Sequence, residues 1–94
     1  MTENTERIAL LRKKIDAVDD KLTELLVERA TLAHEVGVAK GSSAVYRPER
    51  ERVVLERVIE RSRALGGKLE GASLAQIFRE IMSACRSLEK PMRV

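Results

Sequence analysis

Three basic residues near the start of the chain could bind a small dianion. Positions 8, 11, 15, 18, 22, 25, 29, 32, 36 and 39 recur at intervals of three and four residues, and all are apolar except Arg29. A guanidinium keeps its charge in proteins, and a buried charge without a partner costs several kcal/mol. Arg29 therefore needs an anionic partner, which is either a protein carboxylate that sets the helix register or a ligand.

Helical geometry groups Lys40 with Arg29 and separates Arg12 from both. Lys40 follows Arg29 by eleven residues, which is about 16 Å along a helix and about 20° around it. Arg12 precedes Arg29 by 17 residues, about 25 Å along the helix and about 100° around it. Arg12 therefore cannot join Arg29 of its own chain in one pocket, but an antiparallel partner helix could bring it there. Taken singly, Arg12 also fits a surface charge and Lys40 an ordinary lysine at a helix C-terminus.

Two further groups could complete a site. Arg47, Arg50 and Glu51 lie at the start of a second helical segment, where free N–H groups can hold a ligand hydroxyl or carboxylate. Glu51 also suits the helix dipole without any ligand. Cys85 and Glu89 lie one helical turn apart near the end of the chain, where Glu89 also fits a solvated residue.

Three helices are expected to position these groups. Apolar residues recur at helical intervals over about residues 5–40, 48–65 and 73–90, and no segment has the alternation of a strand. Phenylalanine and tyrosine occur once each, so the core must be aliphatic. The fold class is therefore all-α, with one domain over residues 1–94.

Turn residues mark the predicted helix ends. Pro48 suits the first turn of the second helix, where its missing N–H is not needed. Gly66 and Gly67 can adopt the left-handed conformation that ends a helix. The spacing of Ser73 and Gln76 is that of a capping box, which predicts the start of the third helix there.

The length of the first helix predicts a homodimer. Residues 5–40 would form a rod about 50 Å long, whereas a compact globule of this size has a radius of gyration of about 12 Å. The remaining residues cannot cover the apolar seam of such a rod. We therefore expect an obligate dimer in which a second copy covers it.

Composition limits the other classes of function. The 18 basic residues are interleaved with 15 acidic ones, so the net charge of +3 does not indicate a nucleic-acid binder. One cysteine allows no internal disulfide, no residues have metal-ligand spacing, and His34 is alone. No apolar run has the length of a signal peptide or a membrane span. These features favour a cytoplasmic protein without a metal or other cofactor.

The assembled residues resemble the all-helical chorismate mutases, including mutase domains fused to a prephenate dehydratase. The resemblance covers most of the chain and lies in LRKKIDAVDDKLTELLVERATLAHEVGVAK, YRPERERVVLERV and LAQIFREIMSACRSLE. It implies an intertwined dimer of three-helix chains that converts chorismate to prephenate, in phenylalanine and tyrosine biosynthesis, without a cofactor. Each of two active sites would contain residues of both subunits. Fusion to a dehydratase domain in a longer protein is one arrangement that it implies.

The resemblance also assigns roles to the candidate residues. Arg12 of the partner and Arg29 would bind the two carboxylates of chorismate. Lys40 would donate to the ether oxygen, and Glu51 would accept from the ring hydroxyl. The backbone of Arg47 would assist Glu51.

This chain departs from some relatives at several of these positions. Arg47 replaces an aspartate, so only a backbone role transfers to it. For Arg50 the resemblance implies a supporting role. Cys85 replaces a serine and is a weaker hydrogen-bond donor. Glu89 replaces a glutamine, and a carboxyl group can donate to the ether oxygen only when protonated. We expect burial and substrate charge to favour the protonated acid.

Three alternatives remain at this point. A relative that removes pyruvate from isochorismate would use a similar pocket. A helical dimerisation module without catalytic activity would bind no small dicarboxylate. A basic nucleic-acid binder would show strongly salt-dependent binding of DNA.

Overall fold

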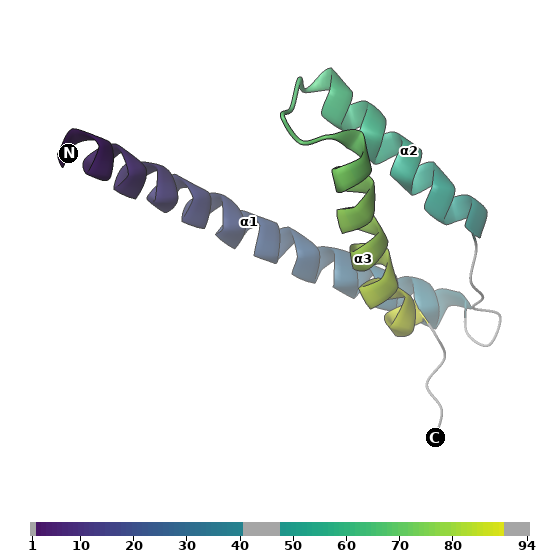
Figure 1. Ribbon diagram of the computed structural model, residues 1–94. Helices are drawn as coiled ribbons and strands as arrows, with labels where there is room; N and C mark the ends of the chain where they lie inside the picture. Colours follow the sequence, from purple (N-terminus) through teal and green to yellow (C-terminus); the bar gives the residue numbers. More distant parts are fainter. Residues whose placement is uncertain (1, 41–47, 90–94) are drawn as a thin grey trace.

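The computed structural model describes residues 2–40 and 48–89, which form three α-helices (Figure 1). They are α1 (Thr2–Lys40), α2 (Pro48–Ala64) and α3 (Gly71–Glu89). No strand occurs within these residues. The all-α class and the three predicted helices are therefore confirmed, with ends that lie within a few residues of those predicted. The predicted loop over residues 41–47 lies outside the described residues.

The end of α2 follows the predicted glycine mechanism. Gly66 has a φ of 65°, in the left-handed region. The N–H of Gly66 donates to the carbonyl of Arg63 at 3.1 Å, and the N–H of Gly67 donates to the carbonyl of Ser62 at 3.2 Å. This pair of hydrogen bonds is a Schellman motif, which satisfies the last carbonyls of the helix.

The start of α3 differs from the prediction. The N–H of Leu74 donates to the carbonyl of Glu70 at 3.0 Å, so Glu70 is the N-cap and Ser73 already lies inside the first turn. The first residue of α3 also lies close to α2: a Cβ atom on Gly71 would lie 3.2 Å from Cγ2 of Ile59, a tight contact that glycine avoids. The helix therefore begins two residues before the predicted capping box, at a glycine packed against α2.

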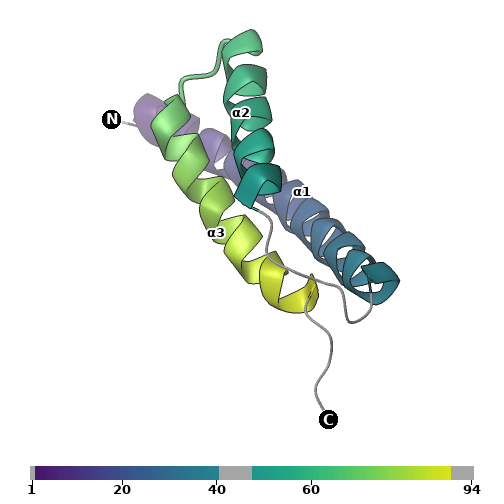
Figure 2. The same cartoon turned by 90° about the vertical axis from the view of Figure 1, so that its right-hand side faces the viewer.

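The helices form a chain of contacts in which α3 is central. Among the described residues α3 packs against both α1 and α2, whereas α1 and α2 do not contact each other (Figures 1 and 2). The apolar residues that are buried within the described part of the chain are few and mostly small: Ala33, Ala75, Met82 and Cys85. No residue of α2 is fully buried. One copy of the chain therefore has only a small core.

The apolar seam of α1 is exposed along its length. Its large side chains are all more than a third exposed: Ile8, Leu11, Ile15, Val18, Leu22, Leu25, Leu32 and Val36. The described chain measures 60 × 29 × 16 Å and has a radius of gyration of 17.5 Å. A compact chain of this length would have a radius of gyration of about 12 Å. The predicted overhang of the first helix is confirmed.

The face of α1 that packs against α3 is not the seam. The buried positions on α1 are Ala33 and Gly37, which lie about 40° and 80° around the helix from Arg29. Both residues are small, which lets α3 approach closely. Because α3 uses this neighbouring stripe, the seam stays exposed even where α3 lies beside it.

Candidate active site

The C-terminal half of α1 carries two of the predicted site residues. Arg29 and Lys40 belong to one continuous helix and are both half-buried. The predicted spacing of about 16 Å on one face therefore holds. Two long cationic side chains at this spacing can reach toward one small dianion between them.

Arg12 lies in a different part of the molecule. It is exposed, on the N-terminal half of α1 that extends beyond α2 and α3 (Figure 1). The continuous helix between Arg12 and Arg29 separates them by about 25 Å. Within one copy of the chain, Arg12 therefore does not join Arg29 and Lys40.

An ion pair connects the start of α2 to the end of α3. Nη2 of Arg86 donates to Oε2 of Glu51 at 2.6 Å. The two side chains are 39% and 23% exposed, so the pair is partly shielded from water. Glu51 lies in the first turn of α2, where the helix dipole also favours its negative charge. The C-terminal ends of α1 and α3 lie at the same end of the molecule (Figures 1 and 2).

The structure describes only some of the remaining predicted site residues. Cys85 is a buried free thiol in the small core, one residue before Arg86. Arg50 is exposed in the first turn of α2. Glu89 is the last residue of α3, but its side chain lies outside what the structure describes, and so does all of Arg47. Their contacts with substrate stay predictions.

Sequence reasoning missed Arg86, although a signal for it exists. Arg86 lies four residues after Met82, so it continues the stripe of α3 that contains this buried side chain. A charged residue in line with a buried stripe is the signal that singled out Arg29. Applied to the third helix, the same reasoning would have predicted a carboxylate partner for Arg86.

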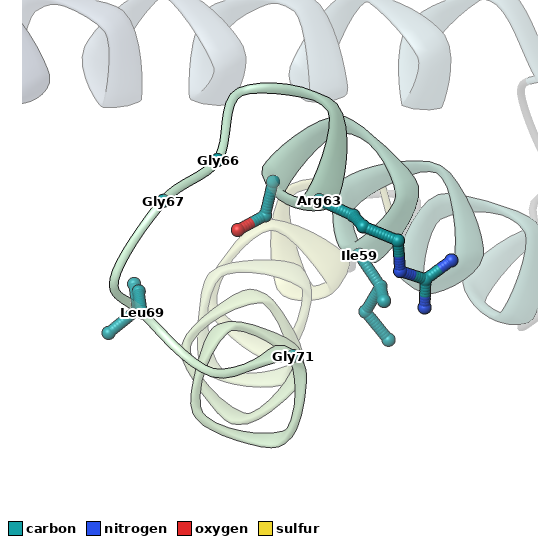
Figure 3. Close-up of a pocket in the computed structure, with 7 residues that line it drawn as sticks. Ile59, Arg63, Gly66, Gly67, Leu69 and Gly71 are labelled. Carbon is teal, nitrogen blue, oxygen red and sulfur yellow. The ribbon is translucent and has the colours of Figure 1, made fainter.

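A pocket at the other end of the helical hairpin does not have the composition of this site (Figure 3). It lies between the end of α2 and the start of α3 and is lined by Ile59, Ser62, Arg63, Gly66, Gly67, Leu69 and Gly71. Its one charged residue, Arg63, forms an ion pair with Glu60 at 2.8 Å. None of the predicted site residues lines it.

The described residues contain neither a metal-binding cluster nor a membrane-spanning helix. Within residues 2–40 and 48–89, no group of three or more His, Cys, Asp and Glu residues could hold a metal ion. His34 is exposed on α1. None of the helices in the described part of the chain is both long and apolar enough to cross a membrane.

The fold and these charges define an all-helical domain with basic side chains and the Glu51 carboxylate at the end where its helices meet. A family model described as chorismate mutase type II matches residues 11–90. The chain belongs to this family, whose members are isomerases, and the resemblance drawn from the sequence is confirmed.

The curated relatives agree with the family. The chain is 45% identical over 83 residues to the bifunctional chorismate mutase/prephenate dehydratase of Neisseria gonorrhoeae, which covers 88% of the chain and 22% of the relative. It is 41% identical over 96 residues to the protein of the same name from Pseudomonas aeruginosa, covering 95% of the chain and 26% of the relative. A chorismate mutase of Methanocaldococcus jannaschii is 38% identical over 55 residues, 56% of each chain.

These bifunctional relatives are much longer than the chain. The chain spans about a quarter of the length of the bifunctional relatives it matches. No solved structure matches it significantly.

Proposed function

We propose that this domain converts chorismate to prephenate by an intramolecular [3,3] rearrangement. In this reaction the ether C–O bond breaks while a C–C bond forms within the same molecule, so no atom or electron enters or leaves. The protein can help by holding the substrate in its compact reactive conformer and by stabilising negative charge at the ether oxygen. Membership of the chorismate mutase type II family is the observation that carries this proposal.

The two arginines would supply the conformational part of catalysis. Arg29 and Arg12 of a partner subunit would each hold one carboxylate of chorismate in a bidentate pair. Fixing both carboxylates brings the ring and the enolpyruvyl tail together. The half-buried position of Arg29 in an otherwise apolar seam supports this role, because such a cation needs an anion.

Three other residues would act on the oxygens of the substrate. Lys40 and the protonated form of Glu89 would donate to the ether oxygen, whose negative charge grows toward the transition state. Glu51 would accept a hydrogen bond from the ring hydroxyl. Support for Glu51 comes from its half-buried position in the first turn of α2, where its ion pair with Arg86 connects it to α3.

The active form would be a homodimer with two shared sites. Eight large apolar side chains of the α1 seam are exposed in one copy, and burying the exposed part of each would contribute roughly 1 kcal/mol. A second copy laid antiparallel along the seam would cover them. It would also bring its Arg12 toward Arg29, which lies about 25 Å away within one chain.

The function is tested by incubating the purified protein with chorismate and following its ultraviolet absorption. We expect chorismate to disappear and prephenate to form in equal amounts. A parallel incubation with isochorismate tests for release of pyruvate. If isochorismate yields pyruvate and chorismate yields no prephenate, the protein is a lyase and the proposed reaction is wrong. If neither compound is turned over, a dimerisation module without catalytic activity is favoured.

We also propose a fused domain and a cellular compartment for this domain. The names of the bifunctional relatives support a full-length protein that carries a prephenate dehydratase domain as well. A dehydratase beside the mutase would consume its product. The free thiol of Cys85 suits a reducing compartment, which supports the cytoplasm.

A further inference from the structure

The ion pair between Arg86 and Glu51 involves a residue to which the proposed function gives no task. Glu51 is the proposed acceptor for the ring hydroxyl, and Nη2 of Arg86 lies 2.6 Å from its Oε2. The pair joins two helices across 35 residues of sequence. We propose that Arg86 is a positioning residue that holds the carboxylate of Glu51 ready for the ring hydroxyl of chorismate. This inference rests on the proposed function.

A second ion pair in the chain shows what distinguishes this one. Nη1 of Arg63 lies 2.8 Å from Oε2 of Glu60, but both residues belong to α2 and are separated by three positions. Their side chains are 71% and 72% exposed. Exposed pairs of this kind fix little, because water screens them and each side chain moves freely. Arg86 and Glu51 are much less exposed, so their geometry is better held.

The chemistry of the pair is compatible with substrate binding. A carboxylate offers about four lone-pair sites, so an arginine on one oxygen leaves capacity for a hydroxyl donor. Hydrogen bonds to a charged carboxylate are stronger than those between neutral groups. Without Arg86, Glu51 would lose this link to α3, and its side chain could adopt other rotamers.

The role makes a specific kinetic prediction. The hydroxyl contact exists in the bound substrate and in the transition state alike, so weakening it should raise KM and leave kcat nearly unchanged. We expect Arg86→Met to raise KM for chorismate about five- to tenfold, with kcat within about twofold of wild type. Arg86→Lys keeps a cation but loses the planar fork, and we expect an intermediate KM.

A substrate analogue separates positioning from a general structural effect. The probe is a chorismate analogue with hydrogen in place of the ring hydroxyl, which can itself rearrange, so its inhibition constant is measured from initial rates of competition with chorismate. If Arg86 acts through Glu51 on the hydroxyl, Arg86→Met leaves the inhibition constant of this analogue unchanged. In a Glu51→Gln background, Arg86→Met should likewise add no further loss in kcat/KM. Arg63→Met serves as the matched control and should match wild type in every measurement.

Each result has a defined meaning. Equal loss of affinity for chorismate and for the analogue would overturn the role, because Arg86 would then act on the fold or on another part of the substrate. An unchanged KM in a folded Arg86→Met variant, checked by circular dichroism, would overturn it as well. Should Arg86→Met fail to fold, the intermediate KM of Arg86→Lys decides. A wild-type protein that leaves chorismate untouched would overturn the proposed function itself, before any variant is compared.

Discussion

The two halves of α1 have the same apolar repeat but different surroundings. The C-terminal half packs against α3 through Ala33 and Gly37, and it carries Arg29 and Lys40 at the end where the helices meet. The N-terminal half extends beyond the other helices, with Arg12 on its surface (Figure 1). An apolar seam over both halves would suit the proposed contact with a second copy, because one copy leaves it exposed. The half that looks idle in one chain would complete the site of the other.

The largest effect should come from a charge in the exposed seam. Val18 and Val27 are both 62% exposed in one copy of the chain, but Val18 lies in the seam and Val27 faces about 160° away from its centre. Val18→Asp would bury one uncompensated charge per subunit, at about 3–5 kcal/mol each, and weaken the dimer at least about 10⁴-fold. Sedimentation at micromolar concentration should then show monomers without activity.

Val27→Asp is the matched control for this experiment. It introduces the same charge at the same exposure, and we expect a dimer with wild-type activity. If both variants stay dimeric and active, the seam is not the dimer interface and the two halves of α1 do not cooperate across subunits.

The next largest effect concerns the two arginines. Removing one partner of a buried charge pair costs about 2–5 kcal/mol, so Arg12→Ala and Arg29→Ala should each lower kcat/KM about 10²–10³-fold or more. Mixing the two inactive proteins should restore activity, because one site of each heterodimer has both arginines intact. With random exchange half of the dimers are mixed and half of their sites are intact, so about a quarter of wild-type activity should return.

The mixing experiment distinguishes shared sites from separate ones. Subunit exchange is verified with a differently tagged copy of each variant. A mixture that exchanges fully but stays inactive would contradict a site built from both halves of α1, whatever the oligomeric state.

The next prediction concerns Lys40, in the C-terminal half of α1. Its proposed partner is the ether oxygen, which carries most charge in the transition state, so its removal should affect turnover more than affinity. We expect Lys40→Ala to lower kcat about 10²–10³-fold with a much smaller rise in KM. Steady-state kinetics with an unchanged kcat would refute this role, and Lys68→Ala, in the exposed turn between α2 and α3, serves as a control.

A smaller effect is expected from pH. A carboxyl group at position 89 can donate to the ether oxygen only when protonated, whereas an amide donates at any pH. Activity of the wild type should therefore fall as pH rises through neutrality, and Glu89→Gln should flatten the profile. A wild-type pH–rate curve that is already flat would remove Glu89 from the mechanism.

Local rules predicted the helices well, because each end depends on a few neighbouring residues. Gly66 and Gly67 predicted the end of α2 since the left-handed turn is a property of the backbone itself. The start of α3 was predicted two residues late. Its first residue, Gly71, lies close to Ile59 of α2, and a contact between helices leaves no local signal in the sequence.

The site was predictable where it follows one helix and not where it joins two. The spacing of Arg29 and Lys40 follows from helical geometry alone, so the sequence was sufficient for their shared face. Arg86 meets Glu51 only because α2 and α3 fold back on each other, and this packing depends on the whole hairpin. Pairings between helices are therefore the part that needed the structure.

The smallest effect is expected far from the site, at the turn after α2. Gly66 has a φ of 65°, and a Cβ there would meet nothing within 4 Å, so Gly66→Ala adds backbone strain without a clash. We expect a loss of about 1 kcal/mol in the free energy of unfolding, measured by urea denaturation, with kcat and KM unchanged.

Gly67→Ala is the control, because its φ is not positive and its Cβ would lie 3.4 Å from Oγ of Ser62, nearly ordinary contact. An equal loss in both variants would mean that space, not backbone conformation, requires glycine here. Loss of activity in Gly66→Ala would mean that the geometry of this turn reaches the other end of the helical hairpin, where Arg86 and Glu51 meet.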